Sequence, residues 1–171
     1  SERHFSPVAF DALCEKLTER QDTLLLLHRN PDGDAVGSAF ALRELLTSLG
    51  SRAWCVCESE IPERLRFLSA PAQESVLLSS VPADFSDVRI ISADVASPAQ
   101  LGALRERFES RTDFMIDHHG TGTPFADFYT DPRAAATGEI VFDVIRRMER
   151  EGRTHLTARI AELLYAAISS D

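Results

Sequence analysis

The most informative part of this chain is the stretch Leu24-Leu25-Leu26-Leu27-His28-Arg29-Asn30-Pro31-Asp32-Gly33-Asp34. Its four consecutive leucines predict that residues 22–28 form a strand buried on both faces, as in a parallel sheet. The Asn-Pro-Asp-Gly sequence that follows is typical of a turn. One histidine and two aspartates are therefore expected just beyond the carboxyl end of a buried strand.

Two further strands are predicted to end in the same way. Residues 88–93 are predicted to form a strand that ends at Asp94, and the buried strand predicted at residues 114–116 leads directly into Asp117-His118-His119. Shorter extended segments are predicted at residues 52–57, 75–78 and 127–130.

Helical patterns alternate with these strands. Apolar spacing and capping residues predict helices over residues 7–20, 34–49, 62–68, 97–109 and 137–151, and from Thr157 onward. Thr137 is expected to cap the fifth of these helices. Strands that alternate with helices are typical of an α/β fold, so we predict a doubly wound, mainly parallel sheet flanked by helices.

The acidic and imidazole groups are expected to meet at one edge of this sheet, because ligands of doubly wound sheets bind beyond the carboxyl ends of the strands. His28, Asp94 and Asp117 each lie at or just after such an end. Asp171 lies three residues after Ile168 and shares its inward helical face. Four separate elements thus direct these groups to one place.

A mixture of carboxylates and imidazoles without thiolates suits Mn²⁺, with Mg²⁺, Co²⁺ or Fe²⁺ as alternatives. Asp32 and Asp34, on either side of Gly33, can face two neighbouring ions, and Asp94 is expected to bridge them. Two ions roughly 3.5–4 Å apart can activate a water and stabilise the oxygens of a phosphoryl displacement. The sequence therefore predicts a metal-dependent hydrolase.

Nearby groups are expected to hold a phosphate. The helix that begins at Asp34 is expected to offer free backbone N–H groups around Gly37 and Ser38. Of His118 and His119, one is expected to bind metal and the other to hydrogen-bond the phosphate.

Each cluster also has an ordinary interpretation. The segment 30–33 alone is a plain turn, and adjacent histidines at a strand end can form a polar cap. Both clusters together, with Asp94 and Asp171 at compatible positions, favour the metal site.

Composition limits the partners of the chain. Its 171 residues suffice for one domain, and its net charge of −9 argues against binding to long nucleic acid. The sequence has no apolar run of membrane-spanning length. The three cysteines Cys14, Cys55 and Cys57 form no disulfide framework, so we expect buried thiols and a cytoplasmic protein.

The ordered polar residues resemble a known family. Their order and strand context resemble the four motifs of the DHH phosphoesterases over nearly the whole chain; they are His28-x-x-x-Asp32-x-Asp34, Asp94, Asp117-His118-His119 and Asp171. Segments 28–38 and 131–139 resemble the branch of nanoRNases and 3′-phosphoadenosine-5′-phosphate (pAp) phosphatases.

The resemblance implies a role for each of these residues. One manganese ion would be held by His28, Asp32 and Asp94. The other would be held by Asp34, Asp94, His118 and Asp171. His119 would contact the scissile phosphate, and Asp117 would orient the site.

The implied activity is hydrolysis of short single-stranded oligonucleotides to 5′-mononucleotides, of pAp to AMP, or of both. Alternatives are a cyclic- or linear-dinucleotide phosphodiesterase, an inorganic pyrophosphatase, and a non-catalytic nucleotide-binding module. We expect no membrane partner and no long duplex, and we consider a homodimer as one oligomeric state.

The sequence departs from the family pattern at two points. The branch often has Asn three residues after the second histidine, whereas this chain has Gly122. The chain also stops at Asp171, where relatives continue into a smaller substrate-binding domain. We therefore expect residues 1–171 to be the DHH catalytic domain of a longer protein, and expect the domain alone to turn over slowly.

Overall fold

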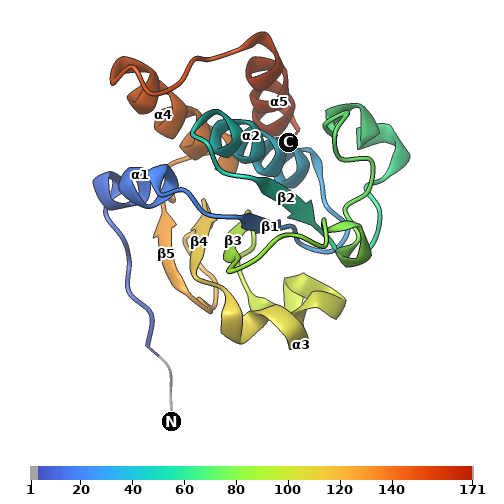
Figure 1. The fold of residues 1–171 in the computed structure, drawn as a ribbon. Coiled ribbons are helices and arrows are strands. Elements are labelled where there is room, and N and C mark those ends of the chain that lie inside the picture. The colour runs from blue at the N-terminus through green and yellow to red at the C-terminus, as the bar shows by residue number, and fades with distance from the viewer. Residues whose placement is uncertain (1–3, 171) are drawn as a thin grey trace.

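A five-stranded sheet runs through the centre of the computed structural model, which describes residues 4–170 (Figure 1). The strands lie in the order β2-β1-β3-β4-β5. Their bounds are Thr23–Leu26 for β1, Ala53–Val56 for β2, Arg89–Ala93 for β3, Phe114–Asp117 for β4 and Asp127–Thr130 for β5. All four strand pairs are parallel, so the predicted parallel sheet is confirmed.

Helices cover both faces of the sheet (Figure 1). One face carries α1 (Phe10–Thr18), α2 (Gly33–Ser48), α4 (Thr137–Arg150) and α5 (Ala158–Ser169). The other carries the 3₁₀ helix η3 (Pro98–Leu104) and α3 (Arg105–Phe108), which is followed by η4 (Glu109–Arg111). Two further 3₁₀ helices, η1 (Glu63–Leu68) and η2 (Leu78–Ser80), lie between β2 and β3 in the chain. This arrangement confirms the doubly wound α/β fold.

The helices within residues 4–170 are short or polar by the standard of membrane spans. None of these helices is both long enough and apolar enough to span a bilayer.

The leucine run is buried from both sides. Leu25 and Leu27 belong to the apolar cluster shared with α1, α2, α4 and α5, whereas Leu24 and Leu26 belong to the cluster on the α3 side. None of the four is more than 4% exposed. Because burial of apolar surface contributes about 25 cal/mol per Å², the run anchors β1 centrally and fixes where His28 leaves the sheet.

Close packing of α2 on α5 explains a glycine in the middle of α2. A Cβ atom at Gly37 would lie 2.5 Å from the Leu163 carbonyl oxygen and 2.9 Å from the Ala167 Cβ. Gly37 therefore serves helix packing, and the prediction of a phosphate seat around Gly37 and Ser38 is wrong. Ser38 is likewise fully buried, and its hydroxyl donates to Asp34 Oδ1 at 3.0 Å.

Two predicted elements differ from the structure. Residues 75–78 form no strand, because the Glu60 carboxylate accepts the bond from Val76 N (3.0 Å) that a ladder partner would take. The helix predicted over residues 97–109 is interrupted at Gly102, whose φ of 59° does not fit a right-handed helix.

The starts of two helices differ from the prediction, one in its first residue and the other in its cap. Helix α1 begins at Phe10 rather than residue 7, since Pro7 pairs with Phe128 in an isolated parallel β-bridge. Helix α4 begins at Thr137 itself, and its N-cap is Ala136, which makes no side-chain cap bond. The predicted capping role of Thr137 is therefore wrong.

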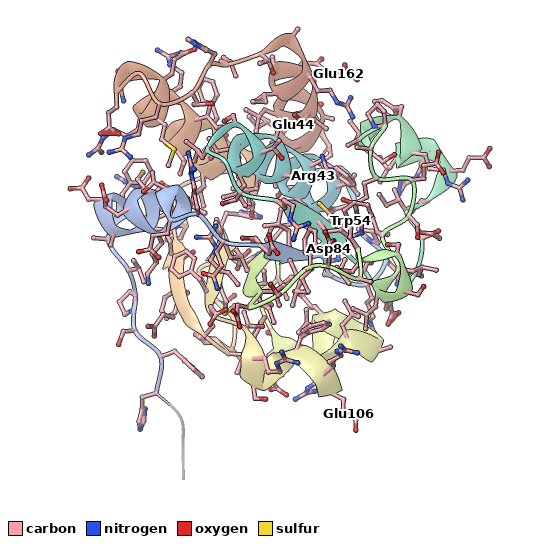
Figure 2. All side chains as sticks on the ribbon, viewed as in Figure 1. Arg43, Glu44, Trp54, Asp84, Glu106 and Glu162 are labelled. Carbon is pink, nitrogen blue, oxygen red and sulfur yellow. The ribbon has the colours of Figure 1, made fainter. Side chains whose placement is uncertain are left out.

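Trp54 lies on β2, an edge strand of the sheet (Figure 2). The Arg43 guanidinium lies 5.8 Å from the Trp54 ring centroid, and the indole Nε1 donates to Ser80 Oγ at 2.9 Å. On the same strand, the Gln73 side chain bonds both backbone groups of Cys55, which makes this edge less available for pairing with another chain.

Candidate metal centre

The predicted site residues meet where the strand order changes direction. Strands β2 and β3 lie on opposite sides of β1, and in doubly wound sheets the carboxyl side of such a point forms a crevice. His28 lies two residues after β1, Asp94 directly follows β3, and Asp117 is the last residue of β4. The fold thus delivers three chemically active side chains to one crevice.

The turn after β1 fixes His28 and Asp32. Asn30 has a φ of 52°, which turns the chain sharply towards α2, and Asp32 is the N-cap of that helix, with Oδ1 accepting from Ala35 N at 2.9 Å. His28 Nδ1 lies 2.8 Å from the Arg29 carbonyl oxygen. Because a carbonyl only accepts, Nδ1 must donate, and Nε2 is left to face the carboxylates.

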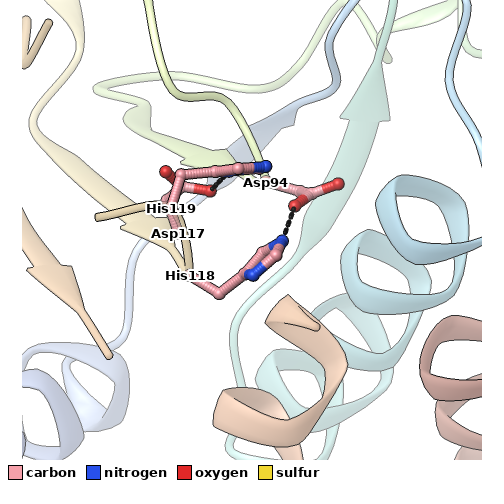
Figure 3. Close-up of side chains that lie close together, drawn as sticks. All are labelled: Asp94, Asp117, His118 and His119. Atoms are coloured by element: carbon pink, nitrogen blue, oxygen red, sulfur yellow. Dashed lines mark hydrogen bonds and ion pairs between the residues drawn. The ribbon is translucent and has the colours of Figure 1, made fainter. Parts of the chain in front are cut away.

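Asp94 lies between two histidines, and each of its oxygens faces a different one. Oδ2 lies 3.7 Å from His28 Nε2, and Oδ1 lies 3.6 Å from His118 Nε2 (Figure 3). These distances exceed those of good hydrogen bonds. Two atoms that each lie about 2.1 Å from a shared ion, at angles of about 90–120°, would be about 3.0–3.6 Å apart. The spacing therefore suits ligands that share a cation.

The backbone at Asp94 is unusual. Its φ of 64° lies in the left-handed region, where residues other than glycine are uncommon. Its backbone N–H donates to the Ile116 carbonyl at 2.9 Å, and its side chain is 4% exposed. The chain thus turns immediately after β3 and directs a buried carboxylate into the crevice.

Asp34 lies at the start of a helix, as the sequence predicted. It lies in the first turn of α2, is 5% exposed, and accepts bonds from Thr137 N (2.9 Å), Gly138 N (3.0 Å) and Ser38 Oγ. Its Oδ2 lies 3.7 Å from His118 Nε2. Asp34 therefore joins α2 to the start of α4 while facing the crevice.

The electrostatics of these groups follow from burial and crowding. Burial and the neighbouring Asp94 raise the pKa of Asp34 to about 6. The three hydrogen bonds that Asp34 accepts lower its pKa, but by less than burial and Asp94 raise it. Burial lowers the pKa of His28, but Asp32 and Asp94 outweigh this and raise it to about 10, while His28 lowers the pKa of Asp32 to about 2. A divalent cation would relieve this crowding of negative charge.

Asp117 and His119 form a separate pair at the end of β4. His119 Nδ1 lies 2.5 Å from Asp117 Oδ1 (Figure 3). Burial raises the pKa of Asp117, and that of His119 is raised because Asp117 outweighs the effect of burial. The His119 side chain is 41% exposed, so it can reach a ligand from solvent.

Two groups of side chains have ligand atoms close enough to hold an ion. Within each group these atoms lie within 4.8 Å of one another; one group is His28, Asp32 and Asp94, and the other is Asp94, Asp117, His118 and His119. Asp94 belongs to both. The predicted ligand Asp171 lies outside the described residues.

A cavity of about 130 Å³ lies beside His119. Its walls include Ala96, Met115, Gly120, Gly122, Phe128 and Tyr129. At Gly122 a Cβ atom would overlap the Ala96 carbonyl oxygen, and Thr123 N donates to that same oxygen at 2.9 Å. The glycine that departs from the family pattern thus lets this loop pack closely on Ala96.

Sequence reasoning missed Thr137 as part of the site. Its hydroxyl donates to Asp94 Oδ1 at 2.8 Å. The available signal was the Thr137-Gly138 pair at the start of a helix, which we interpreted as a cap.

Comparison with known proteins identifies relatives of this chain. A bifunctional oligoribonuclease and PAP phosphatase, NrnA, of Thermus thermophilus is 34% identical over 146 residues, which cover 84% of this chain and 41% of the relative. This chain spans less than half the length of each of the curated relatives compared with it.

Solved structures with the same fold include an exopolyphosphatase-related protein from Bacteroides fragilis, with a TM-score of 0.75, 23% identity, and coverage of 92% of this chain and 48% of that one. A manganese-bound exonuclease RecJ has a TM-score of 0.51 and 20% identity over 92% of this chain and 41% of its own. The N-terminal domain of the DHH family matches residues 22–168. This chain therefore belongs to the DHH family.

Proposed function

We propose that this domain is a manganese-dependent phosphoesterase that hydrolyses short oligonucleotides to 5′-mononucleotides, pAp to AMP, or both. The observation that carries the proposal is the position of Asp94, whose two oxygens face His28 and His118 separately. A carboxylate between two sets of ligands is what a pair of ions requires. NrnA of T. thermophilus, named for both activities, supports the choice of substrate.

The donor set fits two divalent ions. His28, Asp32 and Asp94 would hold one of them, and Asp34, Asp94, His118 and Asp171 the other. Oxygen and nitrogen donors without sulfur suit Mn²⁺, and the manganese in the RecJ structure supports that choice. When bound, the ions would supply Lewis-acid chemistry, lowering the pKa of water and stabilising charge on phosphoryl oxygens.

His119 would contact the scissile phosphate, and Asp117 would orient it. The hydrogen bond that His119 Nδ1 donates to Asp117 Oδ1 fixes the ring. The raised pKa of His119 favours the protonated ring, in which Nε2–H can donate to a phosphoryl oxygen. An imidazole that gains or keeps a proton beside Asp117 also offsets charge that develops during the reaction.

The cavity beside His119 favours a nucleotide over pyrophosphate. Its walls include apolar groups such as Met115 and Phe128, which suit a nucleoside rather than a second phosphate. The net charge of −9 disfavours long nucleic acid, which requires a basic surface. The homodimer and the cytoplasmic location stay predictions.

The first experiment measures Mn²⁺ binding and turnover in the same preparation. The EDTA-treated chain is titrated with Mn²⁺ and then incubated with pApA, pAp, cyclic di-AMP and pyrophosphate, with products separated by chromatography. At 100 times its dissociation constant, an ion should raise the free energy of unfolding by about 2.7 kcal/mol. Preferential release of AMP from pApA or pAp is expected.

A different pattern would change the assignment. Faster hydrolysis of cyclic di-AMP or pyrophosphate would contradict the proposed substrates while leaving the metal site intact. Nucleotide binding without Mn²⁺-dependent turnover, in a chain that also includes any following substrate-binding domain, would indicate the non-catalytic module instead.

A further inference from the structure

The Thr137 hydroxyl bonds a site carboxylate instead of capping the helix in which it lies. It is the first residue of α4 and is fully buried. A threonine at a helix start commonly caps the helix through its own side chain, but here the hydroxyl donates to Asp94 Oδ1 at 2.8 Å. The hydroxyl therefore serves the carboxylate rather than the helix.

The backbone of the same residue contacts a second site carboxylate. Thr137 N donates to Asp34 Oδ2 at 2.9 Å, and Gly138 N donates to Asp34 Oδ1 at 3.0 Å. A Cβ atom at Gly138 would lie 2.6 Å from the Ala167 Cβ, so a larger residue would push α4 away from α5. The first turn of α4 thus holds Asp34 and Asp94 together.

We infer that Thr137 is a positioning residue of the metal centre, which fixes the rotation of the Asp94 carboxylate. This inference rests on the proposed function. With Oδ1 tied to Thr137, Oδ1 faces His118 and Oδ2 faces His28. A carboxylate oxygen has two acceptor directions, so Oδ1 can accept from Thr137 and still bind an ion.

The expected size of the effect follows from other metal sites. Groups that hydrogen-bond a metal ligand orient it, and their loss typically weakens metal affinity about 10–100-fold. The loss of affinity should be limited to ions bound by Asp94, because the Thr137 side chain makes no other hydrogen bond among the described residues.

The test compares two matched pairs in the full 171-residue chain. The first pair is wild type and Thr137→Val, in which a methyl group replaces the hydroxyl. The second pair is Thr137→Ser and Thr137→Ala, which differ only in the hydroxyl oxygen. Mn²⁺ affinity and stoichiometry are measured by calorimetric titration, and coupling between ions by electron paramagnetic resonance. Wild type and Thr137→Ser should bind alike, whereas Thr137→Val and Thr137→Ala should bind about 10–100-fold more weakly.

A control separates positioning from general packing. Thr112 is also buried, but its hydroxyl donates to the Phe108 carbonyl at 2.8 Å, just before β4 and away from the crevice. Thr112→Val should lower the melting temperature and leave Mn²⁺ affinity unchanged. The second pair keeps the comparison available if Thr137→Val fails to fold.

The outcomes are distinguishable. Unchanged Mn²⁺ affinity in both hydroxyl-free variants, or equal losses in Thr137→Ser and Thr137→Ala, would overturn the role of Thr137 alone. Absence of Mn²⁺ binding in the wild type would overturn the proposed function and this inference with it.

Discussion

The two ends of the parallel sheet both carry charged residues, but their partners differ. At the amino end, Arg52 donates to Asp22 Oδ2 and to Asp84 Oδ2, each at 2.7 Å (Asp84 is labelled in Figure 2). Arg89, at the start of β3, donates to Thr23 Oγ1 at 3.0 Å. Arg52 thus has two carboxylate partners at ordinary hydrogen-bond distances. Arg89 also donates to the Lys16 carbonyl, but its buried Nη2 has no hydrogen-bond partner among the described residues.

At the carboxyl end the corresponding distances are longer. Asp94 and Asp34 lie 3.6–3.7 Å from the nearest imidazole nitrogens, and both are almost fully buried. Asp34 and Asp94 accept hydrogen bonds from the start of α4 and from Ser38, but no cationic group among the described residues lies within hydrogen-bond distance of either carboxylate. Buried negative charge without a close counter-charge is costly. The comparison teaches that the carboxylates of the amino end are paired with an arginine, whereas those of the carboxyl end are placed where they could hold cations.

The largest expected effect is at Asp94. Asp94→Asn should reduce Mn²⁺-dependent hydrolysis roughly 10³-fold or more, because both ions would share this carboxylate. Initial rates with pApA and Mn²⁺ stoichiometry are measured together. Asp84→Asn, the same chemical change at the amino end, is the matched control and should leave both unchanged. Equal losses of hydrolysis and Mn²⁺ binding in the two variants would contradict the assignment of the metal site to the carboxyl end of the sheet.

His119 should affect turnover without affecting metal. His119→Asn should lower kcat roughly 10²-fold, the usual contribution of an acid–base group, because the side chain would lose its contact with the phosphate. Mn²⁺ affinity, measured by titration, should stay within about twofold if Asp94 and His118 hold the ion without it. A parallel loss of Mn²⁺ affinity would make His119 a metal ligand instead.

Asp34 at the carboxyl end and Asp22 at the amino end should contribute to stability with opposite pH dependence in metal-free protein. The pKa of Asp34 is raised to about 6, so its contribution to stability falls as pH rises from about 4 to 6. The raised pKa of His28, about 10, gives a contribution that is complete below about 6.5 and is lost as pH rises through 10. At the amino end, the hydrogen bond from Arg52 lowers the pKa of Asp22, so its contribution is complete above about 3.9 and is lost in acid.

Denaturant unfolding of EDTA-treated protein across this range checks the sign. The free energy of unfolding should fall by on the order of 2 kcal/mol between about pH 4 and 6, and Asp34→Asn should flatten this decrease. Saturating Mn²⁺ should reverse the trend, because metal binds the deprotonated ligands. A metal-free stability that rises over the same range would contradict the assignment.

The smallest effect is expected at Arg52. Arg52→Gln should cause a slight decrease in the denaturation midpoint, because surface ion pairs contribute little. The decrease should shrink further at high salt, which screens exposed charges. Mn²⁺ binding should not change, and a change would show that the two ends are coupled through the sheet.

Much of the fold was predictable because the strands are fully buried. A continuous apolar run such as Leu24–Leu27, and a mostly apolar stretch such as 88–93, have few other interpretations once helices alternate with them. Elements that depend on a single distant contact were not predictable. Gly102 interrupts a helical pattern, and Glu60 takes the hydrogen bond that would have extended a strand at Val76.

The sequence predicted which of the described side chains would meet in the crevice, but not the contacts that hold them there; the predicted ligand Asp171 lies outside the described residues. The order of the acidic and imidazole residues after strand ends identified the side chains that the crevice collects. The sequence did not show that Asp34 would accept bonds from the start of α4, or that Thr137 would bond Asp94. Those contacts depend on how α2, α4 and α5 pack, and local patterns carry little information about that.

The backbone at Asp94 has a consequence for directed evolution. A φ of 64° suits glycine better than any side chain, so Asp94→Gly would relax the turn while removing the carboxylate that we propose to bridge the ions. Libraries selected only for survival at high temperature should recover glycine at residue 94. Libraries selected for hydrolytic activity should keep aspartate at residue 94. Selection for stability and selection for activity would therefore favour different residues at this position.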